Sequence, residues 1–98
     1  MSIEKPLDNI LSTGLKVKII RLFVSRREDF MASGREIAKL IDVTPPAAHA
    51  ALKELSDRDI LKMNIVGRQH IYKINKHNRI VKNILVPAFE KERSLPIT

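Results

Sequence analysis

The segment SGREIAKLIDVTPPAAHAALKEL, at residues 33–55, determines the fold that the sequence predicts. Ser33 and Glu36 have the Ser-x-x-Glu spacing of a capping box, in which each side chain accepts a hydrogen bond from the backbone N–H of the other residue. A helix is therefore expected to begin just after Ser33. Ile37 and Ile41 then recur at helical spacing, which places an apolar stripe on one face of this helix.

A second helix is expected after a short turn at Asp42 and Val43. Thr44 is a suitable N-cap, and Pro45 would occupy the first helical position, where the missing N–H of proline costs nothing. The apolar face of this helix consists of Ala48, Ala51, Leu52 and Leu55. Two short helices joined by such a turn form a helix-turn-helix, whose second helix can enter the major groove of DNA.

The chain before this motif predicts one longer helix at about residues 13–27, capped by Ser12 or Thr13. Its broad apolar arc indicates that it is covered on more than one side. The arc includes Leu15, Ile19, Leu22 and Phe23. Phe30 and Met31 are expected to form a very short strand. Residues 1–12 are expected to be a flexible lead-in.

The apolar period changes from 3.6 to 2 after the helix-turn-helix, which indicates two strands of a hairpin. Gly67 and Arg68 suit the central positions of a type II′ turn. This turn predicts a register that pairs Leu61 with Ile74, Met63 with Tyr72, Ile65 with His70, and Lys62 with Lys73. Like charges directly opposite each other destabilise a hairpin. Either a phosphate lies across the two lysines, or their flexible side chains diverge into solvent.

A last helix is expected at about residues 77–92, with a bend or break near Asn83–Pro87 because proline removes one helical hydrogen bond. Residues 93–98 are expected to be a tail. The apolar stripe of this helix is expected either to pack on the first helix or to contact a second copy of the chain. The residues expected in such a dimer are Ile80, Ile84, Leu85 and Phe89.

Composition favours a small globular domain that interacts with polyanions. The chain has 98 residues, 44% of them hydrophobic, no cysteine and a net charge of +7. Residues 60–89 contain six lysines and arginines and no acidic residue, which is typical of a phosphate-facing surface. No apolar run approaches the roughly 20 residues of a membrane span, and the N-terminal segment does not resemble a signal peptide. A cytoplasmic location is the default expectation.

The predicted order is helix, short strand, helix, helix, two-stranded hairpin and helix, a mostly α winged helix-turn-helix with a β-hairpin wing (α+β). Residues 14–92 resemble small prokaryotic winged helix-turn-helix transcription regulators of the ArsR and MarR kind. SGREIAKLIDVTPPAAHAALKELSDRDIL is similar to their helix-turn-helix, and VGRQHIYKIN to their wing. The sequence is also similar to the winged helix that precedes some nucleotidyltransferase domains. The resemblance implies a DNA-binding domain at residues 13–92.

The resemblance further implies that the second helix of the motif is the recognition helix. Its outward face would then consist of Thr44, Pro46, Ala47, His49, Ala50 and Lys53. Only His49 and Lys53 offer strong polar contacts to bases or phosphates, whereas the alanines offer methyl contacts. This face is poorer in polar residues than the family pattern, so specificity is expected to be modest or to come from the wing and from DNA shape.

The wing is expected to bind DNA through its tip and its lysines. The tip residues are Arg68, Gln69 and His70, and an arginine there fits a minor groove or a phosphate. Lys62 and Lys73 would hold the DNA backbone. Ser33 and Arg35 are further candidates for phosphate contacts at the start of the first helix of the motif.

No catalytic or metal-binding constellation is evident in the sequence. The three histidines fall on different predicted elements, and no phosphate loop or nucleophile with a base partner is present. The sequence therefore predicts neither an enzyme nor a cofactor or metal site. Two functions remain. The first is a homodimeric transcription regulator that binds double-stranded DNA. The alternative is a protein-interaction module, for example one accessory to a nucleotidyltransferase.

Overall fold

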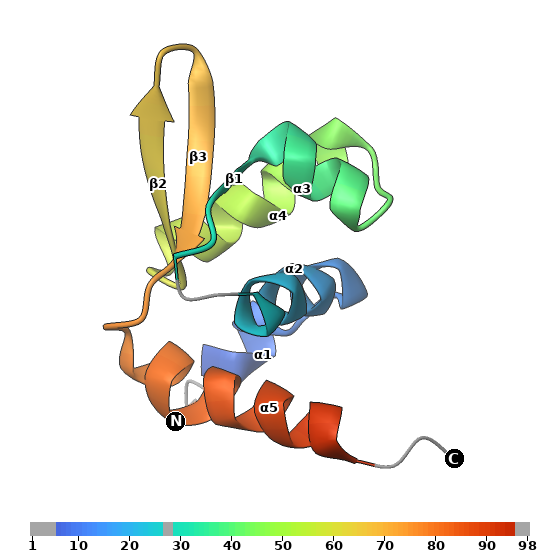
Figure 1. Ribbon diagram of the computed structural model, residues 1–98, viewed down its shortest axis with the longest axis vertical. Coiled ribbons are helices and arrows are strands. Elements are labelled where there is room, and N and C mark those ends of the chain that lie inside the picture. The colour runs from blue at the N-terminus through green and yellow to red at the C-terminus, as the bar shows by residue number, and fades with distance from the viewer. Residues whose placement is uncertain (1–5, 27–28, 96–98) are drawn as a thin grey trace, which may run out of the picture.

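The computed structural model describes residues 6–26 and 29–95 and shows a winged helix-turn-helix (Figure 1). Its elements are α1 (Pro6–Ile10), α2 (Gly14–Ser25), β1 (Ala32–Ser33), α3 (Gly34–Leu40), α4 (Pro45–Asp57), β2 (Leu61–Val66), β3 (Gln69–Ile74), the π-helical segment η1 (Val81–Leu85) and α5 (Val86–Ser94). This confirms the predicted mostly α fold with a β-hairpin wing. None of the described helices is long and apolar enough to cross a membrane.

Local chemistry explains where the helix-turn-helix begins and turns. Ser33 and Glu36 form the predicted capping box, with both hydrogen bonds at 3.2 Å. Asp42 adopts a φ of 57°, the left-handed conformation that aspartate tolerates better than most residues. Thr44 occupies the N-cap of α4 without a side-chain capping bond, and Pro45 opens the helix as predicted. The turn therefore depends more on Asp42 and Pro45 than on the Thr44 hydroxyl.

The hairpin has the predicted register throughout. Leu61 pairs with Ile74, Met63 with Tyr72, Ile65 with His70, and Lys62 with Lys73. Gly67 has a φ of 63°, and the turn residue Arg68 is not among the described residues with positive φ, in agreement with a type II′ turn. The short strand is at Ala32–Ser33 rather than at Phe30 and Met31, because it is Ala32 that pairs with Tyr72. The sheet order is β1-β3-β2.

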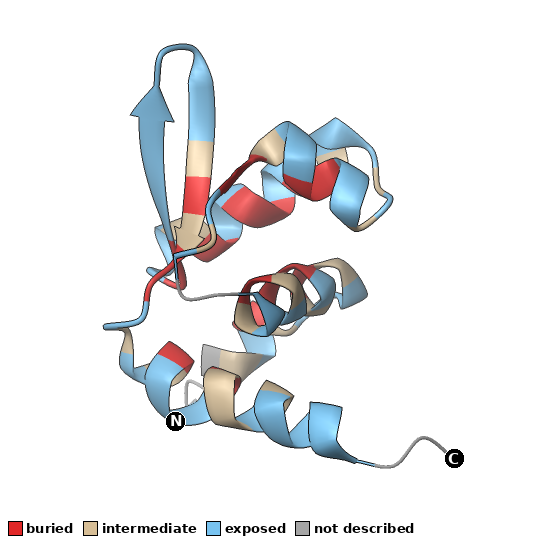
Figure 2. Ribbon diagram, in the orientation of Figure 1, coloured by how far each residue is buried: buried red, intermediate tan, exposed pale blue. Residues whose placement is uncertain are grey.

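The predicted lead-in at residues 1–12 is wrong where the structure describes it, since residues 6–10 form α1 and Ile10 is buried in the core. Residues 1–5 lie outside the described part. The core lies between α2, the helix-turn-helix and the base of the wing, while most of the hairpin projects into solvent (Figure 2).

The irregularity near Pro87, predicted as a bend or break, is the π-helical segment η1, and the helix continues through Pro87. Asn78 Oδ1 accepts hydrogen bonds from the N–H groups of Ile80 and Val81 and so defines its start. The π-helical turn η1 directly precedes Pro87, and Val86 N–H donates to Val81 O five residues earlier. Such a widened turn accommodates the missing N–H of proline without a break.

The C-terminal helix packs on α2 within one chain. The guanidinium of Arg21 lies 5.4 Å from the ring centre of Phe89, and its Nε donates to Glu92 at 2.8 Å. Leu85 is 1% exposed, so its prediction as a dimer contact is wrong. Ile84 is 43% exposed, and Ile80 and Phe89 are half-buried against the core.

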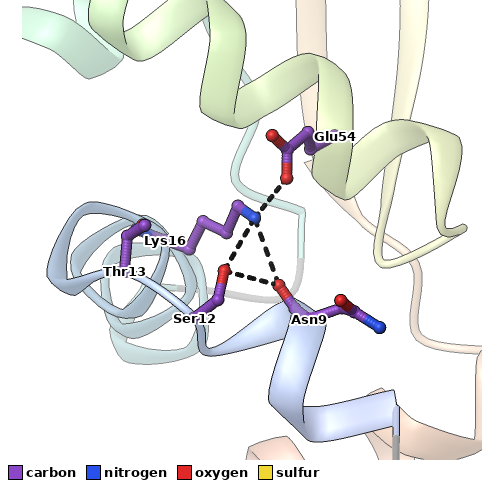
Figure 3. Close-up of polar contacts among 5 residues, drawn as sticks. All are labelled: Asn9, Ser12, Thr13, Lys16 and Glu54. Carbon is purple, nitrogen blue, oxygen red and sulfur yellow. Dashed lines mark hydrogen bonds and ion pairs between the residues drawn. The ribbon is translucent and has the colours of Figure 1, made fainter. Parts of the chain in front are cut away.

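A buried lysine joins the N-terminal helices to α4 (Figure 3). Lys16, on α2, is 6% exposed, and its Nζ donates at 3.1 Å to both Asn9 O and Ser12 Oγ. The same Nζ forms an ion pair with Glu54 on α4. Thr13 caps α2 by accepting from Lys16 N–H at 3.2 Å. The ammonium group therefore ties together α1, α2 and α4.

Replacing Lys16 with methionine should destabilise the fold by about 1–3 kcal/mol, because Asn9 O and Ser12 Oγ lose a charged donor while the apolar stem is retained. Urea denaturation measures the change in the free energy of unfolding. Lys18→Met, at an exposed position of the same helix, is the control. Equal stability of the two variants would show that the buried ammonium contributes nothing net.

Glu54 should stabilise the fold at neutral pH by an amount that decreases as the pH is lowered. The hydrogen bond and charge of Lys16 hold the pKa of Glu54 below its usual range. A carboxyl whose pKa is lower in the folded state stabilises the fold above its unfolded pKa, and this stability is lost as pH falls through the folded pKa. Glu54→Gln should therefore be less stable than the unmodified chain at neutral pH, with the difference shrinking in acid. Thermal unfolding against pH tests this, with Glu90→Gln on α5 as control. A difference that does not change with pH would contradict it.

Candidate nucleic-acid interface

A basic groove lies between the start of the helix-turn-helix, α4 and the wing. It has a volume of about 500 Å³ and is lined by Ser33, Gly34, Arg35, Pro45, His49, Arg68, Gln69, His70 and Tyr72. Six of these residues are among those predicted from the sequence to contact DNA: Ser33, Arg35, His49, Arg68, Gln69 and His70. The structure thus brings together candidates from three separate stretches of sequence.

Each side of the basic groove is positioned by a local feature of the chain. The capping box fixes the backbone at the start of α3, next to Arg35. The type II′ turn places Arg68 at the tip of the wing. His49 on α4 faces His70 on β3, with ring centres 6.4 Å apart, so the helix and the wing meet across the groove.

The electrostatics of the basic groove favour an anion. None of its lining residues is acidic, and Arg35 and Arg68 are both exposed. Tyr72 also lines the groove, and burial raises the pKa of its phenol above the usual range. Sequence reasoning did not select Tyr72 as a groove residue, although the predicted register already placed it on the same hairpin face as His70.

The outward face of α4 contributes His49 to the basic groove. Thr44, Pro46, His49, Ala50 and Lys53 are exposed, whereas Ala47 is half-buried. Lys53 Nζ forms an ion pair with Asp57 one turn later, at 3.3 Å. An exposed pair of this kind is weak, so Lys53 can exchange its partner for a phosphate at little cost.

Lys62 and Lys73 are not brought to the basic groove. They are directly opposite each other, on the hairpin face that points away from Tyr72 and His70. They line a different cavity, of about 350 Å³, together with Asp29, Met31, Ile74, Asn75, Lys76 and His77. The predicted DNA-binding residues therefore divide between two faces of the wing.

The described part of the chain contains no cluster of potential metal ligands. Among residues 6–26 and 29–95, no group of three histidine, cysteine, aspartate or glutamate side chains could hold a metal ion. His49 and His70 approach each other as a pair without a third ligand. The lining of the basic groove consists of cationic, hydrogen-bonding and small side chains.

The fold is that of solved ArsR-family transcription regulators. The structure of the AntR antimony-specific transcriptional repressor matches with a TM-score of 0.68 and 19% identity, over 92% of this chain and 79% of that chain. An ArsR family transcriptional regulator matches with a TM-score of 0.61 and 22% identity, over 97% of this chain and 100% of that chain. TubR, a protein of type III plasmid segregation, matches with a TM-score of 0.67 and 15% identity, over 100% of this chain and 96% of that chain.

No family model matches the sequence, and the search of curated proteins gave no match. At identities of 15–22% the structural likeness establishes the winged-helix fold and no more. It confirms the resemblance inferred from the helix-turn-helix and the wing. What this chain binds must be argued from its own basic groove.

Proposed function

We propose that this protein binds double-stranded DNA as a small transcriptional regulator. The observation that carries the proposal is the basic groove, which joins the start of α3, the exposed face of α4 and the wing tip without an acidic lining residue. A winged helix places its recognition helix in the major groove of DNA, which is wide enough to admit an α-helix. The fold shared with solved transcriptional regulators supports the same use.

In this mode α4 enters the major groove and the wing contacts the adjacent backbone or minor groove. His49 is the strongest candidate for a base contact, since it lies on the exposed face of α4 and lines the basic groove. Ala47 and Ala50 offer methyl groups only. Arg68 at the wing tip would contact phosphate or enter a narrow minor groove. Sequence preference should therefore depend strongly on the wing and on DNA shape.

Arg68→Ala should weaken duplex binding and reduce the salt dependence of affinity, because one phosphate contact contributes about 0.9 to the slope of log K against log salt. The slope is measured by fluorescence anisotropy with a labelled duplex at several salt concentrations. Arg93→Ala on α5 removes the same charge from an exposed site outside the basic groove and serves as the control.

Unchanged affinity and slope in Arg68→Ala would remove the wing tip from the DNA interface. No detectable binding of the unmodified chain to genomic or random duplexes at low salt would refute DNA binding altogether. It would favour the alternative of a protein-interaction module, for which the face formed by Pro46, Ala47 and Ala50 is suited.

We further infer that the protein acts as a homodimer through the outer face of η1 and α5. Ile84 is the one predicted dimer residue that is both apolar and exposed. A dimer would bury this side chain and would present two copies of α4 to successive turns of one DNA duplex.

Ile84→Glu should convert the dimer to monomers, because it places a charge in the apolar contact. Sedimentation velocity gives the oligomeric state. Lys91→Glu, an exposed position on α5, is the control for a charge change on the same surface helix. A dimer that persists in Ile84→Glu, or an unmodified chain that is monomeric at micromolar concentration, would contradict this assignment.

A further inference from the structure

A second cationic surface lies on the wing face that points away from the basic groove. We call it the rear surface, and it consists of Arg26, Lys62, Lys73, Lys76, His77 and Lys82. Two cavities, of about 350 and 470 Å³, lie along it and share Ile74, Lys76 and His77. The rear surface therefore runs from the base of the wing to the side of η1.

The rear surface contains a like-charge pair that the fold itself does not require. Lys62 and Lys73 are cross-strand partners, and the register that pairs them is fixed by the Gly67–Arg68 turn and by the buried ends of the strands, Leu61 and Ile74. Like charges in directly opposed positions destabilise a hairpin. An anion that lies across both ammonium groups would remove this cost.

The charge balance of the rear surface favours a polyanion. Five lysine and arginine side chains line the two cavities, whereas only two acidic residues do, Asp29 and Glu90. All of the lysines come from the acid-free stretch at residues 60–89. Arg35 and Arg68, by contrast, line the basic groove, and no residue lines both the basic groove and the rear surface. The basic groove and the rear surface are therefore formed by different residues.

We propose that the rear surface binds the phosphate backbone of a second segment of duplex DNA, so that one chain contacts two duplex segments. This proposal rests on the proposed function, since the first duplex occupies the basic groove. Lysines are compact, flexible point charges that hold phosphates without reading sequence. The extent of the surface, from β2 across β3 to η1, fits several phosphates of one backbone rather than a single small anion.

The test measures binding of one duplex and of two duplexes separately. Anisotropy with a short labelled duplex gives the affinity for a single segment. For two segments, an immobilised duplex is loaded with protein, and capture of a second, fluorescent duplex is recorded. The variant is Lys62→Gln/Lys73→Gln. The matched control is Lys18→Gln/Lys91→Gln, which removes the same charge from exposed positions outside the basic groove and both rear cavities.

The expected result is that the unmodified chain and the control capture the second duplex. The Lys62→Gln/Lys73→Gln variant should lose about tenfold or more of this capture, while its single-duplex affinity changes by less than about twofold. Thermal unfolding checks that the variant is folded.

Unchanged capture in the variant would overturn the proposal, and would assign any bridging to two basic grooves of a dimer or to another surface. A parallel loss of single-duplex affinity would overturn it too, because the lysines would then contact the same DNA as α4. Failure of the proposed function is recognised separately, since the unmodified chain would then show no detectable affinity for a single duplex at low salt. Residual binding in Arg35→Ala/Arg68→Ala that Lys62→Gln/Lys73→Gln abolishes would support the rear surface independently.

Discussion

The contact that positions α4 is made by the buried ammonium group of Lys16. A charge removed from water must be compensated by hydrogen bonds or an opposite charge, and here Asn9 O, Ser12 Oγ and Glu54 supply both. Glu54 lies on α4, whereas Asn9 and Ser12 lie on and just after α1. Apolar packing alone is non-directional and leaves neighbouring helices free to slide by small amounts. The ion pair restricts this freedom, because the ammonium group must satisfy partners on three elements at once. The orientation of α4, and with it the direction of its exposed face, therefore depends on a residue remote from the basic groove.

A second set of polar contacts connects α4 to the wing. Asn75, which is buried directly after β3, donates from Nδ2 to Asp59 O at 2.9 Å, and its backbone N–H donates to Ile60 O at 3.0 Å. Asp59 itself adopts a φ of 63°, which turns the chain sharply between α4 and β2. These bonds hold both strands of the hairpin at the C-terminal end of α4. His49 and His70 can face each other across the basic groove because the base of the wing is fixed in this way.

The features that the sequence predicted correctly are those decided by neighbouring residues. The capping box at Ser33, the turn at Asp42 and the hairpin register each follow from a few adjacent side chains and from strand or helix periodicity. The features it did not predict depend on contacts distant in sequence. Helix α1 is too short to be stable alone and forms where Ile10 reaches the core. In the sequence Lys16 cannot be distinguished from an exposed lysine, because its partner Glu54 is distant along the chain. Leu85 and Ile84 belong to the same apolar stripe. Which of them is buried depends on how the last helix packs on α2, and the sequence does not show this.

The same reasoning explains why a basic hairpin need not present one basic face. Side chains alternate between the two faces of a strand, so the position of a basic residue along the strand decides on which face of the hairpin it lies. His70 and Tyr72 share one face, and Lys73, one residue further on, necessarily lies on the other together with its partner Lys62. Only the turn residue Arg68 brings a permanent charge of the wing to the basic groove. A wing that served a single duplex would gain from lysines at positions 63, 65 or 70, where this chain has Met63, Ile65 and His70. Its lysines occupy the opposite positions, which is the arrangement expected if phosphate is held on both sides of the wing.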